Sequence, residues 1–371
     1  MLIIYRGCIM IKDKKGVISV SVIYSFFLIF CLLLILIMTT YTNNRVNFKL
    51  LKNDIKKVFI TKKPVNKVTL KSKIDSYSKT PLADDLSTTV SEYLKNESSD
   101  KNYISFGVIK NDTIHDNVGK KMIWRIIRIN GDGSIRLIYN ESIGSASFNN
   151  ENNDAVYTGY MFSPNVRNGL STNSNVKRII DQWYEANLKN TVYEQYISPS
   201  IFCVNRNAYT TPSRAASAFG FGTDEQYFED HTRLENFKCD SNFDRFDTRI
   251  NYEGLTESDS PKGNGALTYM IGLLTATEAS KISLTVRGTT ETWTLSPSHY
   301  NSGAYVYYAS SSASSPVYYK QVNISGGIRP VISIKADTEI VDKTDSNYGT
   351  QTNPFVVATN QGTFDTGGVC S

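Results

Sequence analysis

Two cysteines offer the clearest covalent chemistry in this sequence. Cys203 in "IFCVNRN" and Cys239 in "NFKCDSN" stand in polar surroundings that are typical of loops. A disulfide between them would stabilise the fold by about 3–4 kcal/mol, because it restricts the unfolded chain. The alternatives are a zinc site, for which the paired ligand spacings are missing, and a reactive thiol, which would need a nearby histidine. We expect a Cys203–Cys239 disulfide, and therefore a region outside the reducing cytoplasm.

Three carboxylates follow the second cysteine. Asp240, Asp244 and Asp247 in "CDSNFDRFD" are candidate Ca²⁺ ligands, although their spacing differs from that of an EF-hand loop and the closing glutamate is missing. Solvated surface acids are the favoured alternative. The sequence has no glycine-rich phosphate loop and no Ser/His/Asp pattern, and its three histidines are a thin supply for acid–base catalysis. We expect no cofactor and no enzymatic activity.

A run of tyrosines and serines near the end of the chain is the candidate binding surface. Tyrosine offers a large contact area at a small entropy cost, and serine adapts its hydrogen bonds, as in antibody binding loops. The alternative is that "AYVYYA" and "VYYKQV" form two ordinary strands with one row of tyrosines in the core. The candidate ligand-binding residues are Tyr300, Tyr305, Tyr307, Tyr308, Tyr318 and Tyr319.

The candidate residues all lie after a long apolar segment near the start of the chain. Val17 to Thr40 is uncharged, and a helix of this length crosses a hydrocarbon core of about 30 Å. It is longer than the apolar region of a signal peptide. Residues 1–80 carry 15 Lys and Arg against 3 Asp and Glu. We assign this basic flank to the membrane surface rather than to nucleic acid, with the N-terminus in the cytoplasm because the disulfide lies outside.

Beyond the apolar segment, residues 59–103 are polar and predict a linker or stalk. Within this stretch, apolar residues at steps of four over residues 82–96 indicate one short amphipathic helix.

The remaining chain predicts a mixed α+β domain with antiparallel sheets and two helices. Residues 122–140 read as a hairpin around Asn130-Gly131-Asp132-Gly133. A helix is predicted after a Ser174 cap, and a second one after the Thr275–Glu278 capping box. Gly326 to Lys335 predicts a strand with Pro330 at an edge or bulge.

The N-terminal segment resembles type IV prepilins and pseudopilins. The resemblance rests on the basic "KDKKG" leader before a long apolar helix, with residues 1–16 as leader and residues 17–58 as helix. It implies cleavage between Gly16 and Val17, although Ser21 stands where the family usually has glutamate. A plain signal-anchor is the alternative, and Met10 is an alternative start.

The C-terminal domain, residues 104–358 before a tail of residues 359–371, resembles a surface domain of Gram-positive bacteria. The shared segments include "WRIIRINGDGSIRLIYN", "FCVN", "KCDS", "KGNGALTYMIGLLTATEAS", "WTLSPSHY", "GGIRPVISIK" and "GTQTNPFVV". More remotely it resembles the formylglycine-generating-enzyme branch of the C-type-lectin-like fold. The resemblance implies that the domain binds an extracellular glycan or protein.

The sequence therefore supports three alternative hypotheses about function. The first is a non-enzymatic, membrane-anchored or pilin-like surface protein that displays a binding or adhesion domain. The second is a structural minor pilin whose partners are other pilus subunits, and the third is a formylglycine-generating-like modifying enzyme that uses Cys203 and Cys239.

Overall fold

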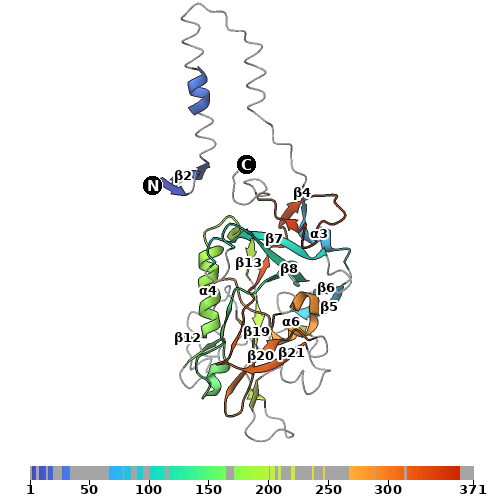
Figure 1. Ribbon diagram of the computed structural model, residues 1–371. Coiled ribbons are helices and arrows are strands. Elements are labelled where there is room, and N and C mark those ends of the chain that lie inside the picture. Colours follow the sequence, from blue (N-terminus) through green and yellow to red (C-terminus); the bar gives the residue numbers. More distant parts are fainter. Residues whose placement is uncertain are drawn as a thin grey trace, which may run out of the picture. The chain divides into compact units, whose positions relative to one another are not determined.

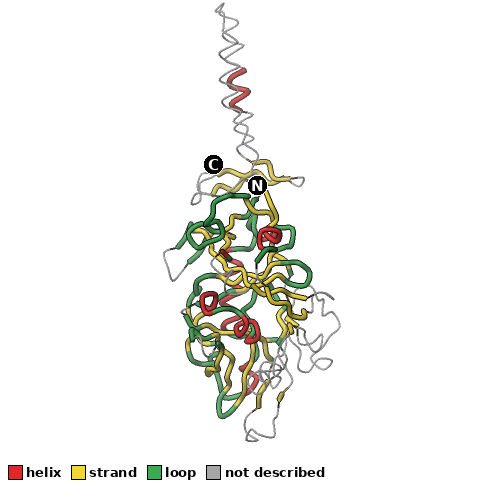
Figure 2. Tube along the Cα trace, turned by 90° about the vertical axis from the view of Figure 1, so that its right-hand side faces the viewer, coloured by secondary structure: helices red, strands yellow, loops and turns green. Residues whose placement is uncertain are grey.

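The computed structural model divides the chain into two compact units, Met1–Pro64 and Val65–Ser371. The second unit is built mostly of strands with few helices (Figures 1 and 2). The expected α+β class is therefore confirmed. The structure describes residues 2–5, 8–13, 16–19, 27–33, 67–77, 79–84, 90–94, 101–112, 117–163, 171–199, 201–204, 208–209, 219–221, 236–237, 245–246, 267–288, 290–312 and 316–359.

The first unit contains a small antiparallel sheet, in the order β1 (Leu2–Tyr5), β2 (Cys8–Asp13) and β3 (Gly16–Ser19). The predicted helix over residues 17–58 therefore does not begin at Val17, which pairs with β2. Its first residues are β-branched and favour extended backbone beside a partner strand. Residues 27–33 are helical. Within the described residues, every helix falls short of the length and apolar character needed to cross a membrane.

The larger sheet of the second unit has nine strands among the described residues. Its order is β13-β23-β9-β8-β6-β5-β17, and β7 pairs with both β8 and β25. The strands are β5 (Lys79–Asp84), β6 (Val90–Leu94), β7 (Tyr103–Val108), β8 (Lys121–Ile129), β9 (Ile135–Tyr139), β13 (Ile197–Ser198), β17 (Asn236–Phe237), β23 (Val331–Ile334) and β25 (Phe355–Val356).

The predicted hairpin is confirmed as β8 and β9, which pair antiparallel. At the turn, the amide of Asn130 donates to the carbonyl of Ser134 at 2.7 Å, and the amide of Gly133 donates to the carbonyl of Asn130 at 2.8 Å. Gly133 has a φ of 83°, which glycine adopts at little cost because it has no Cβ.

The segment expected to be a linker contributes strands instead. The compact unit begins at Val65, and β5 and β6 extend the larger sheet at the edge of β8. The helix expected over residues 82–96 is wrong, because Leu82 lies in β5 and Leu94 in β6. A spacing of four places apolar residues on one face of a helix, but it also places them on one face of a strand, whose period is two.

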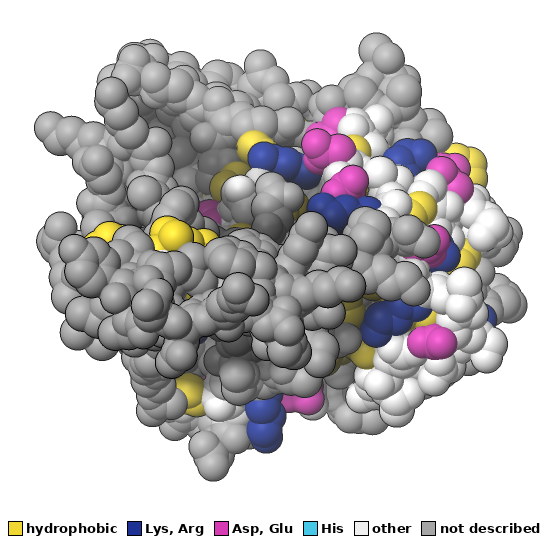
Figure 3. All heavy atoms as spheres, turned by 90° about the horizontal axis from the view of Figure 1, so that it is seen from above, with side chains coloured by type: hydrophobic (Ala, Val, Ile, Leu, Met, Phe, Trp, Pro, Cys, Tyr) yellow, Lys and Arg dark blue, Asp and Glu magenta, His cyan; other side chains and the backbone are white. Residues whose placement is uncertain are grey.

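The same region carries exposed charges of both signs. β4 (Lys67–Thr69) pairs with β24 (Glu339–Val341), and helix α3 (Leu70–Ile74) follows β4. Exposed ion pairs join Lys67 to Glu339 at 3.2 Å and Lys73 to Asp342 at 2.8 Å. Seen from above, basic and acidic side chains are interspersed on the described surface (Figure 3). This mixture does not favour a ligand of one charge sign on this face.

The second sheet has seven strands within the described part of the chain, in the order β10-β22-β19-β16-β15, with β20 beside β19 and β21 beside β20. The strands are β10 (Ser145–Ser147), β15 (Ala208–Tyr209), β16 (Phe219–Phe221), β19 (Thr292–Tyr300), β20 (Ala304–Ala309), β21 (Val317–Gln321) and β22 (Ser325–Gly327).

One predicted strand joins the two sheets. Gly326 to Lys335 is divided at Pro330 into β22, which belongs to the second sheet, and β23, which belongs to the larger one. Pro330 has no amide hydrogen and pairs only through its carbonyl, which accepts from the amide of Tyr139 at 2.8 Å. The sequence predicted one strand with Pro330 at an edge or bulge, whereas the structure interrupts the strand at residues 328–330 and places its two parts in different sheets.

Helix α4 (Asn175–Asn187) confirms the first predicted helix. The hydroxyl of Ser174 accepts from the amide of Lys177 at 3.1 Å, as the predicted cap requires. Its buried side includes Val176 and Ile180, and it stands along one side of the second unit (Figure 1).

Helix α6 (Ala276–Lys281) opens with the predicted capping box. The Thr275 hydroxyl accepts from the amide of Glu278 at 3.1 Å, and the Glu278 carboxylate accepts from the amide of Thr275 at 2.9 Å. A short helix α7 (Leu284–Arg287) follows. Neither α7 nor α3 was predicted. Both have fewer than six residues, too few for a periodic pattern to be visible.

Short elements complete the described chain. They are η2 (Ala155–Thr158), β11 (Met161–Phe162) paired with β12 (Thr172–Asn173), η3 (Glu194–Tyr196), and β14 (Phe202–Cys203) paired with β18 (Arg245–Phe246).

Candidate functional site

The tyrosine-rich run forms strands, as the alternative interpretation predicted. In β20, Tyr307 and Tyr308 have exposed fractions of only 3% and 2%. The Tyr308 ring packs edge-on against Trp293, with 4.8 Å between ring centres. Because these two side chains are buried, they cannot contact a ligand at the surface.

The other four candidate tyrosines lie nearer the surface. Tyr319 has an exposed fraction of 53% and packs edge-on against His299 and Tyr305, with ring centres 4.6 and 5.7 Å apart. Tyr305 and Tyr318 are half-buried, and the half-buried Tyr300 donates from its hydroxyl to the carbonyl of Asn153 at 2.9 Å. Tyr319 is the candidate that a surface ligand could contact most fully.

The candidate disulfide and metal residues fall largely outside the described chain. Cys203 is in β14, but the partner expected for it, Cys239, lies outside the described residues. Asp240, Asp244 and Asp247 also lie outside them. The described residues contain no group of His, Cys, Asp or Glu side chains that could hold a metal ion.

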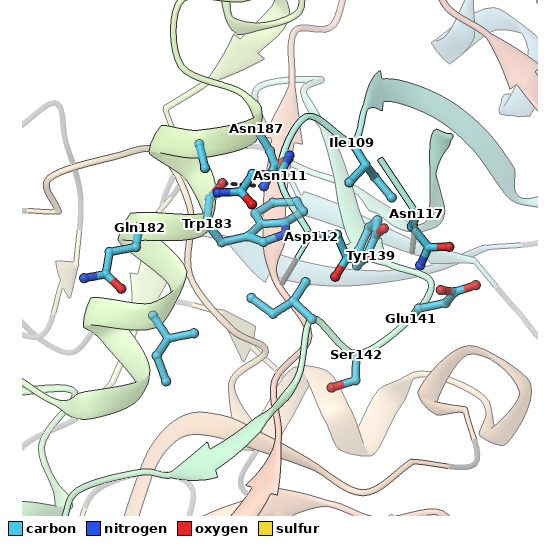
Figure 4. A pocket seen from close by; sticks show the side chains of 13 residues that line it. Ile109, Asn111, Asp112, Asn117, Tyr139, Glu141, Ser142, Gln182, Trp183 and Asn187 are labelled. Atoms are coloured by element: carbon cyan, nitrogen blue, oxygen red, sulfur yellow. Dashed lines mark hydrogen bonds between the residues drawn. The ribbon is translucent and has the colours of Figure 1, made fainter. Parts of the chain in front are cut away.

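A cavity of about 240 Å³ lies between helix α4 and the ends of two strands of the larger sheet (Figure 4). We call it the α4 pocket. Ile109 to Asp112 follow β7, and Tyr139 to Ile143 include the end of β9 and the residues after it. Helix α4 supplies Ile179, Gln182, Trp183, Ala186 and Asn187, which recur at helical steps of three and four and so share one face.

Aromatic rings form one wall of the α4 pocket. The ring of Trp183, which is half-buried, lies 5.4 Å from the ring of Tyr139 and 6.1 Å from that of Trp124, measured between centres. Trp124 is fully buried and donates from its indole nitrogen to the carbonyl of Phe106 at 2.8 Å. The packed rings hold Trp183 in place, because a core tryptophan supports it from behind.

One polar residue fixes the pocket geometry. Asn187 accepts through its Oδ1 from the amides of Lys110 and Asn111, at 2.8 and 2.9 Å, and donates from its Nδ2 to the carbonyl of Trp183 at 3.1 Å. These bonds tie the loop after β7 to the last turn of α4. Asn187 therefore shapes the pocket, and its hydrogen-bonding groups are already used.

Other polar side chains of the pocket have hydrogen-bond donors and acceptors that are not used within the described part of the protein. Within the described residues, the side chains of Asn111, Glu141 and Gln182 have no hydrogen-bond or ion-pair partner, and all three residues are exposed. The amide oxygen of Asn117 accepts from Lys120 Nζ at 2.7 Å, and its amide nitrogen has no partner among the described residues. The pocket thus offers both donors and acceptors beside an aromatic wall.

The charge of the pocket is negative. Asp112 and Glu141 line it, and among the lining residues that the structure describes there is no lysine or arginine. Burial, together with the negative charges of Glu141 and Asp112, raises the pKa of the Tyr139 phenol. The phenol therefore stays protonated over the physiological range, when it can donate a hydrogen bond.

Sequence reasoning missed this pocket. Trp183 falls in the helix predicted after Ser174 but was not among the candidate binding residues, and Asn111, Asp112 and Glu141 belong to no motif. The lining residues come from three separated segments, and only the pairing of β7 with β8 and of β8 with β9 brings their ends to one place. A tryptophan at the border between the buried and exposed faces of α4 is the one signal that could have indicated it.

Comparisons of the chain with protein-family models, with curated proteins and with solved structures find no match.

Proposed function

We propose that this protein is a membrane-anchored cell-surface protein that binds carbohydrate through the α4 pocket without transforming it. The single observation that carries the proposal is the half-buried ring of Trp183 beside the side chains of Asn111, Gln182 and Glu141, which have no partner among the described residues. Sugar rings combine an apolar C–H face with hydroxyl groups at the edge, so an aromatic wall with polar neighbours matches both parts.

The mixture of donors and acceptors supports a hydroxyl-rich ligand. A hydroxyl group donates one hydrogen bond and accepts two. Gln182 and Asn111 offer both kinds of group, and Glu141 offers acceptors. A ligand that carries only ammonium groups would use the acceptors and leave the amide donors unpaired, which costs affinity.

The negative charge of the α4 pocket restricts the class of carbohydrate that it can bind. Asp112 and Glu141 would repel a phosphorylated, sulfated or acidic sugar. Neutral sugars and amino sugars are therefore the favoured class.

Membrane anchoring in this proposal rests on the uncharged segment from Val17 to Thr40 and on its basic flanks. The proposal places the N-terminus in the cytoplasm and the carbohydrate-binding unit outside the cell. The resemblance to prepilins supports display at the surface, and the resemblance to the C-type-lectin-like fold supports a binding role.

The test is a glycan array probed with the full-length chain in a detergent that has no sugar headgroup, because a glycoside detergent would compete. We expect binding to at least one neutral or amino-sugar glycan. Trp183→Ala should weaken this binding at least about tenfold, the effect of losing an aromatic anchor worth roughly 1.4 kcal/mol or more.

Substitutions of exposed residues keep the test informative if Trp183→Ala does not fold. Gln182→Ala and Asn111→Ala should each weaken binding several-fold while the melting temperature stays unchanged. The matched control is Glu185→Gln, an exposed change on α4 outside the pocket. Absence of binding to every glycan would overturn the proposal, as would full binding by all three pocket variants.

A further inference from the structure

A second cavity lies along the same helix as the α4 pocket. It has a volume of about 430 Å³ and is lined in part by Tyr157, Phe162, Asn173 and Arg178. We call it the Tyr157 pocket. Like the α4 pocket, it combines aromatic rings with amide side chains.

The aromatic part of the Tyr157 pocket is a pair of rings. Tyr157 comes from η2 and Phe162 from β11, and their ring centres lie 5.4 Å apart at an interplanar angle of 72°. The Tyr157 hydroxyl donates to the carboxylate of Glu151 at 3.0 Å. Both rings are half-buried, so each keeps a surface available for contact.

The polar part has unused donors and acceptors. Within the described residues, the side chains of Thr172 and Asn173 have no hydrogen-bond partner. The guanidinium of Arg178 donates to the side chain of Asn175 at 3.2 Å, and the other N–H groups of this exposed side chain have no partner in the described part of the chain.

The two pockets adjoin along α4. Arg178 lines the Tyr157 pocket and the next residue, Ile179, lines the α4 pocket. The facing segment is shared in the same way, because residues 141–143 line one pocket and residues 149–151 line the other. Strand β10 connects these two stretches and is held to the helix where Asn175 donates to the carbonyl of Ser147 at 3.0 Å.

From Asn175 to Ala186 the helix rises by roughly 17 Å, which is longer than a single sugar ring. We infer that the two pockets are subsites of one site that binds an extended oligosaccharide along α4, with sugar units against Trp183 at one end and against Tyr157 and Phe162 at the other. This inference rests on the proposed carbohydrate-binding function.

The experiment measures affinity against chain length. The full-length protein is titrated with chito-, malto- and cello-oligosaccharides, each from monosaccharide to hexasaccharide. In the series that binds, affinity should rise at least about tenfold from the shortest bound member to the longest, because added units contact the second pocket.

Arg178→Ala provides the site-specific arm. Because Arg178 is exposed and lies only in the Tyr157 pocket, the substitution should remove most of the gain with length and leave binding of the shortest member unchanged. Glu185→Gln, on the same helix but in neither pocket, should preserve both values.

The outcomes separate the two claims. If the shortest and longest members bind equally well, the proposed function stands and the extended site is overturned. The extended site is also overturned if Arg178→Ala weakens short and long members by the same factor. If no member of any series binds, and the glycan array is also silent, both claims fall together.

Discussion

Tyr308 illustrates how burial determines what a single side chain does in this protein. Its ring lies against Trp293 in the core, and its hydroxyl oxygen accepts from the amide of Gly327 at 3.3 Å. Burial raises the pKa of Tyr308 to about 12 from its ordinary value of 10.0, the Gly327 hydrogen bond lowers it, and the charge of Glu291 raises it further.

This shift predicts a loss of stability at high pH. Because the folded-state pKa of Tyr308 is above the unfolded-state value, its contribution is complete below pH 10 and is lost as the pH rises from 10 to about 12. The loss should be on the order of 2 kcal/mol. Urea unfolding at pH 9 and pH 12 should show a smaller loss for Tyr308→Phe than for the unchanged chain, and equal losses would contradict the assignment.

The sequence could predict the composition of the tyrosine run but not the exposure of each ring. Tyr307 and Tyr319 are direct cross-strand partners, as are Tyr308 and Tyr318. The alternation of side chains along a strand shows which rings share a face of the sheet. It does not show how exposed each ring is: Tyr307 is buried although its partner Tyr319 is exposed, because other parts of the chain cover one ring and not the other. That covering comes from distant parts of the chain, which single-sequence patterns do not identify.

At the scale of elements, helix α6 is attached to the larger sheet through one carboxylate. Glu278 is buried and lies 3.1 Å from the guanidinium of Arg128 on β8 and 3.0 Å from that of Arg136 on β9. The same side chain completes the capping box with Thr275. One residue therefore caps the start of a helix and offsets positive charge in the core.

We predict that Glu278→Gln destabilises the protein far more than loss of the cap alone. Removing one partner from a buried ion pair typically costs about 3–5 kcal/mol, because a charge stays buried without compensation. Thr275→Ala, the matched control for the cap, should cost about 1 kcal/mol. Urea unfolding measures both, and equal losses would show that Glu278 acts only as a cap.

Strand β22 is held by close packing at a glycine. A Cβ at Gly326 would lie 2.5 Å from Cε2 of Tyr308 and 2.8 Å from Cε2 of Trp293. Gly326→Ala should therefore destabilise the second sheet by about 1–3 kcal/mol, the usual effect of overpacking. The exposed neighbour Ser325 offers the control, since Ser325→Ala should change stability by less than about 0.5 kcal/mol. A similar melting temperature for both variants would refute the packing argument.

Elements marked by local signals could be predicted, and elements decided by distant contacts could not. The caps of α4 and α6 and the hairpin turn at Gly133 depend on neighbours in the sequence, and all three are confirmed. The strands β5 and β6 were mistaken for linker and helix because they are held by strand pairing, β6 with β8 and β5 with β6. The polar composition of the segment gave no sign of that partner.

At the scale of the whole molecule, the larger sheet forms the α4 pocket by bringing separate strand ends to one helix. The ends of β7 and β9 face α4, and Asn187 joins the loop after β7 to the helix. Neither the α4 pocket nor the Tyr157 pocket has a sequence motif of its own. Both were therefore invisible until the topology placed their segments together.

The most direct test of the account compares the two candidate aromatic surfaces, the half-buried Trp183 and the exposed Tyr319, in one titration. The full-length chain, Trp183→Ala and Tyr319→Ala are titrated with the glycan that gives the strongest array signal. The α4 site predicts that Trp183→Ala loses at least about tenfold in affinity, whereas Tyr319→Ala binds like the unchanged chain. Loss of binding in Tyr319→Ala with full binding in Trp183→Ala would contradict the account and place the ligand on the tyrosine strands instead.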